Sequence, residues 1–355
     1  MRVSEIAQRA GVSIATVSRV LNDNPSVRPE TALQVRKILD QFPYDRHAVR
    51  RGPRPGKRPK SRTPRSLRHN RIAIVVLGLP HERWFQQPVF GSIVSSITRA
   101  AADRHLAVRI EEVLDVNRIS DGLHGDVADG ALAFVASAAK PELLEAVRGR
   151  LPVVRMMGDD LVPAAVDQVR VDNLEVGHLA FQYLASRGCK HMACITSRPD
   201  HGGLYLRTMA LTAAAARAGL PRPTLYKVGP TAAGPWFGQD AIECKSFDAV
   251  ADHLAAASPR PTGLFVTQDV ETVAFYPSLM SHGLRPGRDV QVVSCNNDHS
   301  LALLTPQPAS VDVNPAAIGR WALRRLLNRI ERPDDSPIQM LIKPSLRTPE
   351  IGEPL

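Results

Sequence analysis

The chain has 355 residues, which exceeds the usual size of one domain and favours two or three units, each able to bury its own core. Its apolar content of 44% and charged content of 23% are ordinary for soluble proteins. The formal charge of +10 is unevenly distributed: residues 1–71 hold 17 Lys and Arg against 5 Asp and Glu, whereas the rest hold 28 against 30. This separation excludes a general basic coat and favours a small polyanion-binding part on a nearly neutral body.

Cysteine usage and hydropathy narrow the class further. The N-terminal sequence MRVSEIAQRAG has no apolar signal region, and no later stretch approaches the ~18 uninterrupted apolar residues that span a bilayer. We therefore expect a cytoplasmic, nucleoid-associated protein with no membrane partner, no metal and no cofactor. The cysteines show no CxxC pair and predict neither a zinc site nor a disulfide framework, so we expect reduced core residues at Cys189, Cys194, Cys244 and Cys295.

Three short helical patterns open the sequence, each with apolar residues at helical spacing. Gly11 ends the first, Ser13 can cap the second, and Pro29 suits the first position of the third. Periodicity alone leaves open whether they form a plain bundle or a helix-turn-helix. The expected core residues are Val3, Ile6, Ala7 and Ala10, then Val17, Val20 and Leu21, then Ala32, Val35, Ile38, Leu39 and Phe42.

The second helical pattern carries the first functional signal. Its sequence, SIATVSRVLN, keeps the apolar stripe on one side and leaves Thr16, Ser18, Arg19 and Asn22 available on the other. Hydroxyl and amide groups suit phosphate oxygens, and an arginine offers two parallel donors to guanine O6 and N7. These side chains favour a DNA-reading helix over a plain bundle.

A basic linker follows the helices at residues 46–71. It contains 11 Lys and Arg, four prolines and no acid, a composition that cannot build a core. Pro53 and Pro55 each remove a helical N–H donor and would cost ~3 kcal/mol inside a helix. We expect the cations, Arg50 and Arg51 among them, to neutralise DNA phosphates without reading sequence.

From Ile72 onward, short β-rich runs alternate with amphipathic helical stretches. Repeated β–α units predict parallel sheets with helices on both faces, and ~280 residues of them predict two doubly wound lobes whose ligands bind beyond the carboxyl ends of the strands. Strands are expected in IAIVVL from 72, ALAFVA from 131, PVVRMM from 152, HMACIT from 191, TGLFVT from 262 and DVQVVS from 289.

Enzyme signatures are weak. The segment from Gly52 to Lys57 is one residue short for a phosphate-binding loop, lacks Ser or Thr after the lysine, and has prolines where N–H groups would cradle phosphate. The pair His81 and Glu82 lacks the second histidine of a zinc protease motif, and no Ser or Cys is flanked by the glycines of a nucleophile elbow. We expect no enzymatic activity; a sugar kinase or hydrolase is the rival.

The sequence VSEIAQRAGVSIATVSRVLN, followed by V-x-P-E-T, resembles the DNA-binding head of the lactose-repressor (LacI/GalR) family. The resemblance implies that the second helix enters the major groove, with Ile14, Ala15 and Arg19 facing bases. Arg28 stands where the family usually has a capping serine, so that contact becomes an arginine–phosphate pair. The positions implied to contact phosphates are Ser13, Thr16, Ser18, Asn22 and Thr31.

The linker departs from the family pattern. Relatives have a hinge helix there, ending in a leucine that enters the minor groove at the operator centre. In register with Tyr44 that leucine position falls on Pro53, so we expect no normal hinge helix. Leu67, in the string RSLR, is the alternative wedge, although it lies closer to Ile72 than the family spacing allows.

The remainder resembles, more diffusely, the sensor domain that the family shares with periplasmic sugar-binding proteins. The likeness implies a cleft in which Arg207 holds ligand hydroxyls or a carboxylate; an exposed arginine at a helix start is the alternative. Gln268 and Asn296 stand where relatives often have an asparagine and an aspartate, so the ligand cannot be taken from a relative. Phe90 and Trp236 are candidate aromatic contacts, equally explained as a core residue and a buried loop anchor.

Asp172, between a β-run and a helix, is explained as well by N-capping as by ligand contact. The expected architecture is an all-α helix-turn-helix head with an α/β periplasmic-binding-protein-like body of two doubly wound lobes. Its expected segments are a DNA-binding domain at 1–45, the linker at 46–71, an effector-binding and dimerising body at 72–345 and a tail at 346–355.

These features predict a transcriptional repressor that binds palindromic double-stranded operator DNA as a homodimer, with half-sites about one helical turn apart. A small sugar-like effector would control it, because a ligand that prefers one closure state of the lobes changes the spacing of the two heads. An architectural DNA-binding protein with a passive dimerising body is the alternative.

Overall fold

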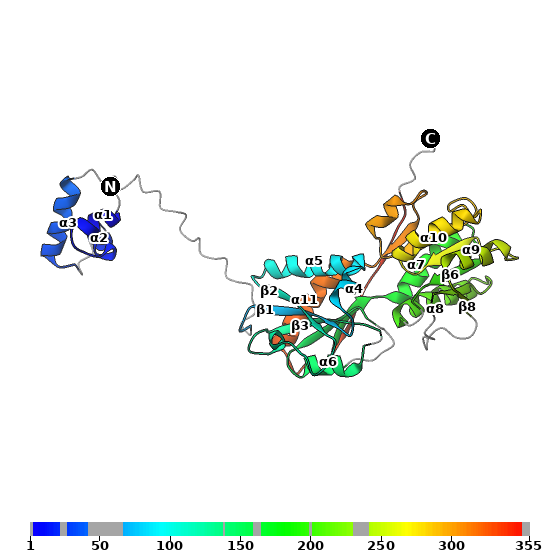
Figure 1. Ribbon diagram of the computed structural model, residues 1–355, viewed down its shortest axis with the longest axis horizontal. Coiled ribbons are helices and arrows are strands. Elements are labelled where there is room, and N and C mark those ends of the chain that lie inside the picture. Colours follow the sequence, from blue (N-terminus) through cyan, green and yellow to red (C-terminus); the bar gives the residue numbers. More distant parts are fainter. Residues whose placement is uncertain are drawn as a thin grey trace. The chain divides into compact units, whose positions relative to one another are not determined.

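The computed structural model describes residues 3–21, 27–41, 67–137, 139–158, 165–198, 201–229 and 241–349. These residues belong to two compact units, a small N-terminal head and a larger body (Figure 1). Most of the linker, with any hinge helix in it, lies outside the described residues. None of the helices that the described residues form combines the length and apolar character needed to cross a membrane.

The head consists of the three helices that the sequence predicts: α1 (Val3–Arg9), α2 (Ile14–Leu21) and α3 (Pro29–Gln41). Gly11 ends the first with a left-handed φ of 61°. Ser13 caps α2, because its Oγ accepts a hydrogen bond from the Thr16 N–H at 3.1 Å. The expected core member Phe42 lies outside the described residues. The buried apolar residues are Ile6, Ala7, Ala10, Val17, Val20 and Val35.

The N-terminal lobe of the body is built on a parallel sheet, whose described strands follow the order β12-β5-β4-β3-β1-β2. Figure 1 labels three of these strands, β1, β2 and β3. The helices α5 (Pro88–Ala102) and α11 (Pro315–Glu331) pack on one face, and α6 (Pro141–Arg148) packs on the other. The lobe also contains α4 (His81–Phe85) and the turn η1 (Asp121–Leu123). Its strands are β1 (Arg71–Leu77), β2 (Ala107–Val113), β3 (Gly130–Val135), β4 (Val153–Met156), β5 (Asp167–Val171) and β12 (Gln339–Ile342).

The C-terminal lobe has a second sheet, with described strands in the order β13-β11-β10-β9-β6-β7-β8, parallel except where β13 pairs with β11. The helices α7 (Asn173–Ser186) and α8 (Gly202–Arg217) cover one face; α9 (Phe247–Ala256) and α10 (Asp269–Ser281) cover the other. The turn η2 (His299–Leu303) follows β10. The strands are β6 (Met192–Thr196), β7 (Thr224–Val228), β8 (Ile242–Cys244), β9 (Gly263–Val266), β10 (Gln291–Cys295), β11 (Ala309–Asp312) and β13 (Ser345–Arg347).

The alternation of side chains across a strand explains which strands the sequence revealed. In β1, one set of residues packs toward α5 and α11 and the other toward α6, so the whole run is apolar and all six predicted strands of this kind are confirmed. The edge strand β2 has the mixed sequence AVRIEEV, in which only Val113 is fully buried, and sequence analysis missed it. The two sets in β1 are Ile72, Ile74 and Val76, and Ala73, Val75 and Leu77.

The body begins earlier than the composition indicates. The Asp129 carboxylate accepts hydrogen bonds from the backbone N–H groups of Arg68, His69 and Arg71, the shortest at 2.7 Å. Leu67 packs against the body's apolar core. The end of the basic segment expected to be linker is therefore bound to the body, because a polar composition does not reveal backbone hydrogen bonds to a distant side chain.

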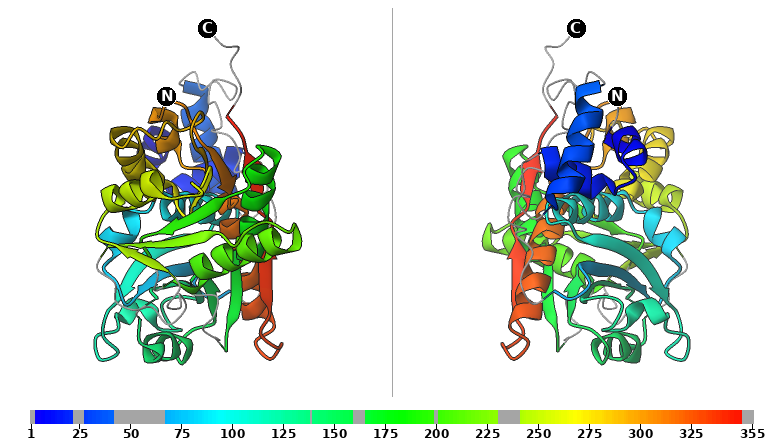
Figure 2. Two further views of the ribbon diagram at one scale, coloured as in Figure 1. Left: turned by 90° about the vertical axis from the view of Figure 1, so that its right-hand side faces the viewer. Right: turned by 90° about the vertical axis from the view of Figure 1, so that its left-hand side faces the viewer.

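In its described part the chain passes between the lobes at residues 171–173, 312–315 and 342–345. As a result, α11 and β12 complete the N-terminal lobe with residues from late in the sequence, and β13 returns to the C-terminal lobe. Figure 2 shows these C-terminal strands, in red, running along one side of the body. Because β13 ends at Arg347, the boundary between body and tail expected after residue 345 falls inside a strand.

Candidate DNA interface and ligand cleft

Helix α2 turns its polar side away from the core of the head. Val17 and Val20 are buried, whereas Ala15 and Arg19 are exposed and Ile14 is 57% exposed. Ala15 and Arg19 are one helical turn apart, so they lie on the same outer stripe. A helix with such an outer stripe fits the major groove of B-DNA, which is wide enough to admit it.

The other head residues predicted to contact DNA differ in what the structure describes. The hydroxyls of Ser13 and Thr16 lie 2.8 Å apart at the N-terminal end of α2. Arg28 is exposed immediately before α3, and Thr31 is half-buried in the first turn of that helix. Outside the described part lie the side chain of Ser18 and the residues Asn22, Arg50 and Arg51.

A cavity of about 440 Å³, here called the interlobe cleft, lies between the two lobes. It is lined by the segments that follow β1, β3, β4, β6, β9 and β10, and by the end of β5. Open parallel sheets bind ligands at the carboxyl ends of their strands. The volume falls within the ~300–1,000 Å³ range of small-molecule sites. The cleft is therefore in the position and of the size that a metabolite site requires.

The N-terminal lobe supplies an aromatic wall to the cleft. The ring centroids of Phe90 and Phe134 are 4.4 Å apart, and the Trp84 ring lies 5.5 Å from each. All three residues line the cavity. Phe90, near the start of α5, is 1% exposed and belongs to the lobe's main core. It is thus both a core residue and part of the cleft wall.

The C-terminal lobe supplies a polar wall that contains Arg207 of α8. Its side chain is 3% exposed, so the alternative of an exposed arginine at a helix start is wrong. Nε donates to Asn173 Oδ1 at 2.8 Å, and Nη1 donates to the Thr267 carbonyl at 2.7 Å. A Cβ at Gly177 of α7 would clash with the Arg207 carbonyl oxygen, so glycine permits the close approach of α7 and α8.

Gln268 and Asn296 add amide groups to the same wall. Gln268 precedes α10, and Asn296 follows β10 with a φ of 117°, a region that asparagine tolerates better than most residues. Asp269 is directed into the lobe instead: its carboxylate accepts hydrogen bonds from the Asp298 N–H at 2.6 Å and the Ser310 hydroxyl at 2.9 Å.

Two other candidates are placed differently. Asp172 caps α7, since its Oδ1 accepts hydrogen bonds from the N–H groups of Leu174 and Glu175, each at 3.1 Å. It is not among the described residues that line the cleft. Trp236 lies outside the described part of the chain, so its contact with a ligand stays a prediction.

Sequence reasoning missed several cleft residues, among them Trp84, Asn173, Arg198 and His201. Arg198 and His201 come from the segment between β6 and α8, and Asn173 is the first residue of α7. The usable signal was that polar residues after parallel strands converge. It failed for Asn173 because the preceding strand β5, with the sequence DQVRV, was not predicted.

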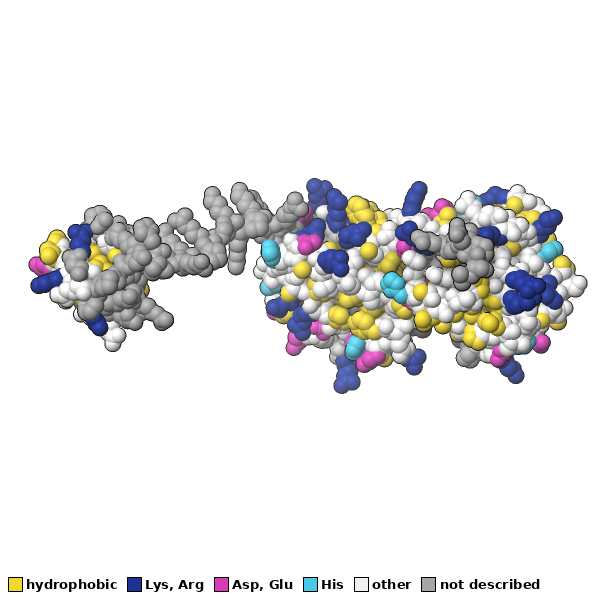
Figure 3. Space-filling view, turned by 90° about the horizontal axis from the view of Figure 1, so that it is seen from above, with side chains coloured by type: hydrophobic (Ala, Val, Ile, Leu, Met, Phe, Trp, Pro, Cys, Tyr) yellow, Lys and Arg dark blue, Asp and Glu magenta, His cyan; other side chains and the backbone are white. Residues whose placement is uncertain are grey.

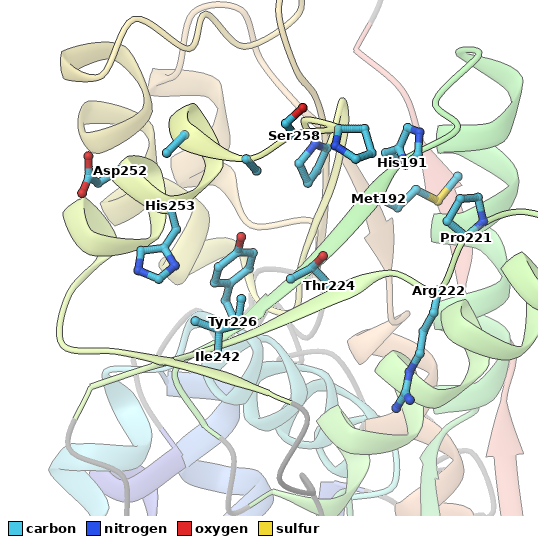
Figure 4. A pocket seen from close by; sticks show the side chains of 14 residues that line it. His191, Met192, Pro221, Arg222, Thr224, Tyr226, Ile242, Asp252, His253 and Ser258 are labelled. Atoms are coloured by element: carbon cyan, nitrogen blue, oxygen red, sulfur yellow. The ribbon is translucent and has the colours of Figure 1, made fainter.

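A second cavity, of about 730 Å³, is lined by the C-terminal lobe alone. Figure 4 shows Tyr226 and Thr224 of β7 between His253 of α9 and Pro221, which precedes the strand. None of its described lining residues comes from the N-terminal lobe. A ligand there would not contact both lobes, which makes the interlobe cleft the stronger candidate for a controlling site.

The reactive groups outside the cleft have structural explanations. All four cysteines are free and buried, as predicted, and burial raises the pKa of the Cys194 and Cys295 thiols to about 12. His81, Glu82 and Glu112 could place ligand atoms around a metal ion, but they are solvent-accessible, and His81 Nδ1 already lies 2.9 Å from Glu112 Oε2.

Comparison with known proteins assigns the head and the body to the same family. Residues 2–47 match the model of bacterial regulatory proteins of the lacI family. Residues 74–229 match the periplasmic binding proteins and sugar binding domain of the LacI family, and residues 181–348 match a periplasmic binding protein-like domain. The chain belongs to the LacI family. This LacI-family member is therefore a DNA-binding transcriptional regulator.

Individual relatives agree with this assignment. The transcriptional regulator MalR of Streptococcus pneumoniae serotype 4 is 24% identical over 92% of each chain, and the ribose operon repressor of Escherichia coli K12 is 25% identical over 93% of each. These relatives are named as regulators, not enzymes. The fold matches a CelR–cellobiose complex (TM-score 0.64, 21% identity, 99% and 100% coverage) and a Lac repressor dimer bound to operator and an anti-inducer (0.61, 18%, 98% of each).

Proposed function

We propose that this LacI-family regulator is a homodimeric repressor of a palindromic operator, controlled by a small metabolite in the interlobe cleft. The observation that carries the proposal is that both lobes line the cleft. A ligand that contacts both lobes stabilises one of their relative arrangements over another. Any factor by which the ligand changes DNA affinity is matched by the factor by which DNA changes ligand affinity.

The relatives support both halves of the proposal: one solved neighbour is an operator complex and another is a cellobiose complex. We assign the base contacts to Ile14, Ala15 and Arg19 of α2. The cytoplasm, where operator DNA lies, is the proposed place of action, and no catalytic role is proposed. The ligand contacts are assigned to Phe90, Arg207, Trp236, Gln268 and Asn296.

The DNA half is tested with Arg19→Ala. This substitution should weaken operator binding by ~1–3 kcal/mol and relax the preference at one base pair per half-site, because a bidentate base contact carries that much discrimination. Lys37→Ala removes an exposed charge from α3 and is the matched control, with no change in base preference expected. Competition binding with single-base operator variants measures both. Equal weakening on all sequences by Arg19→Ala would remove the base-reading assignment.

The ligand half is tested by retardation of an operator fragment with candidate metabolites added. A passive dimerising body predicts unchanged DNA affinity at every ligand concentration, whereas the proposed regulator predicts a shift with its effector. The Arg207→Ala variant should bind operator normally yet lose the response to that effector. Calorimetry that showed unchanged effector affinity in this variant would exclude Arg207 from the site.

We propose further that the linker binds DNA as an electrostatic clamp. Each neutralised phosphate adds ~0.9 to the slope of log K against log salt, so the slope should be steep. Leu67 packs on the body's core, which supports a clamp over a leucine wedge. Loss of discrimination at the central base step in Leu67→Ala would overturn this. The salt slope should flatten by several units, with half-site preference unchanged, when glutamine replaces Arg50, Arg51, Arg54, Lys57 and Arg58.

A further inference from the structure

The interlobe cleft contains positive charge without acid. Among the described residues that line it, none is Asp or Glu, whereas Arg83, Arg170, Arg198 and Arg207 all line it. Arg170 and Arg198 have other interactions within the body. Arg207 differs from them, because it donates its hydrogen bonds to the side-chain oxygen of an asparagine and to a backbone carbonyl, both of them neutral.

The acids behind the cleft wall already have partners of their own. Asp172 accepts hydrogen bonds from the first turn of α7, and Asp269 from a backbone N–H and a serine hydroxyl. Glu271 Oε1 accepts from the Ser197 N–H at 2.7 Å and the Ser197 hydroxyl at 2.6 Å. None of these three carboxylates lines the cavity, so none supplies an acceptor to a group inside it.

A buried guanidinium without a counter-charge is costly. The cationic side chain of Arg207 is only 3% exposed. Desolvating an ion without a nearby opposite charge costs several kcal/mol. Pairing Arg207 with an anion inside the cleft would offset this cost through short, charge-assisted hydrogen bonds.

The described cleft-lining residues include one further donor without a partner. The indole Nε1 of Trp84, a cleft-lining residue, is buried and has no hydrogen-bond partner among the described residues. Asn296 lines the same cavity with a neutral amide, so it adds no negative charge to the wall. Arg207, Gln268 and Asn296 therefore line the same cavity as the rings of Trp84, Phe90 and Phe134.

We propose that the effector is an anionic metabolite, a small carboxylate or phosphate ester, whose acidic group pairs with Arg207 and whose apolar face rests on the aromatic wall. This inference rests on the proposed function and deepens it by naming the ligand class. A neutral sugar would leave Arg207 without a counter-charge, whereas an acid supplies one.

The test uses the purified full-length protein and matched ligand sets: glucose, gluconate and glucose 6-phosphate; ribose, ribonate and ribose 5-phosphate; and inorganic phosphate alone. Thermal melting followed by calorimetry measures binding. An acidic member of at least one set should bind at least about tenfold more tightly than its neutral counterpart, more weakly as salt rises. The better-binding acid distinguishes a carboxylate from a phosphate ester. Melting raised only by a neutral sugar, or by none of these probes, overturns the inference.

Two substitutions locate the bound acid. Arg207→Met should abolish the preference for the acid, whereas Arg207→Lys, which keeps the charge, should retain part of it. Asn296→Asp adds a carboxylate to the cleft wall and should weaken the acid at least about tenfold while sparing or improving the neutral sugar. Because Asn296→Asp does not depend on Arg207→Met folding, an unchanged acid preference in the folded Asn296→Asp variant contradicts the assignment.

The proposed function and this inference fail in different ways. If a neutral sugar binds and changes operator affinity, ligand control stands and the anionic class is wrong. If an acid binds in an Arg207-dependent manner but leaves operator affinity unchanged, the anionic class stands and ligand control is wrong.

Discussion

Two buried charges, Asp167 in the N-terminal lobe and Arg207 in the C-terminal lobe, have partners of opposite kinds. In the N-terminal lobe, Asp167 is 1% exposed and is met by Arg329 and Arg325, whose Nε atoms lie 2.7 and 2.9 Å from its oxygens. In the C-terminal lobe, Arg207 is equally buried, but its hydrogen-bond acceptors are Asn173 and a carbonyl. Asp167, with two arginines beside it, is part of an ion-pair cluster that stabilises the lobe. Arg207, with neutral partners beside a cavity, can pair with a charged ligand.

The carboxylates of the two lobes differ in the same sense. Burial opposes the charge of Asp167, but hydrogen bonds from Arg329 and the Ile338 N–H, with the nearby charge of Arg325, outweigh it and hold the pKa of Asp167 below its ordinary value. For Glu271 in the other lobe, burial dominates and raises the pKa of the carboxyl despite its hydrogen bonds from Ser197 and Thr267.

The largest effect is expected from Asp167→Ala. Removing one partner of a buried ion pair leaves the arginines uncompensated and should cost ~3–5 kcal/mol of unfolding free energy. Arg207→Met is the matched change in the other lobe and should cost clearly less, because Arg207 has no paired acid to strand. Urea denaturation of both variants measures the difference. Equal losses would show that Arg207 is as much a scaffold charge as Asp167.

Two glycine substitutions compare a close helix–helix contact beside Arg207 with an open helix surface in the other lobe. Gly177→Ala should lower stability by ~1–3 kcal/mol, since the added Cβ meets backbone of α8 and displaces Arg207. Gly91→Ala, in α5, has nothing within 4 Å of the added Cβ and should be neutral or stabilising by ~0.5–1 kcal/mol. Thermal melting and effector titration check both. If Gly177→Ala left the effector affinity unchanged, the close contact between α7 and α8 would not be what positions Arg207 for the ligand.

The pH dependence of stability should have opposite signs in the two lobes. A lowered folded pKa means that Asp167 contributes stability above its ordinary value of 3.8 and loses it as pH falls through the folded pKa. A raised folded pKa means that Glu271 costs stability as pH rises from 4.5 through its folded pKa. The measurement is the unfolding free energy of the parent minus that of Asp167→Asn or Glu271→Gln, from about pH 3 to about pH 7. This difference should rise with pH for Asp167→Asn and fall with pH for Glu271→Gln. Parallel slopes would contradict the comparison.

The smallest effect concerns an ion pair at the surface. The hydrogen bond from His81 to Glu112 raises the histidine's pKa above 6.5, so the pair contributes below that pH and is lost as pH rises through the folded value. Surface pairs contribute little to stability, and the pair is best followed by NMR titration of His81. Glu112→Gln should return its pKa toward 6.5. An unchanged titration would assign the shift to Glu82.

The sequence revealed features that depend on local pattern. The head helices and the centrally buried strands could be predicted because burial on all sides leaves an apolar run or stripe. Strands such as β2 and β5 could not, because charged and polar residues interrupt their apolar runs. The cleft was only partly predictable for a similar reason. The family likeness pointed to Arg207 and Asn296, whereas Trp84 joins the site only because the fold brings the ends of several strands together.

The passages of the chain between lobes have a consequence for biosynthesis. The N-terminal lobe requires α11 and β12, and Gly319 of α11 packs so closely that a Cβ there would lie 2.8 Å from the Ile93 carbonyl oxygen of α5. A nascent chain that has emerged only to residue 312 lacks that helix and an edge of that sheet, yet holds nearly all of the C-terminal lobe. Incomplete lobes expose apolar surface and unpaired strand edges. The lobe whose translation begins first therefore stays incomplete until residues 315–342 have been translated and have docked on it.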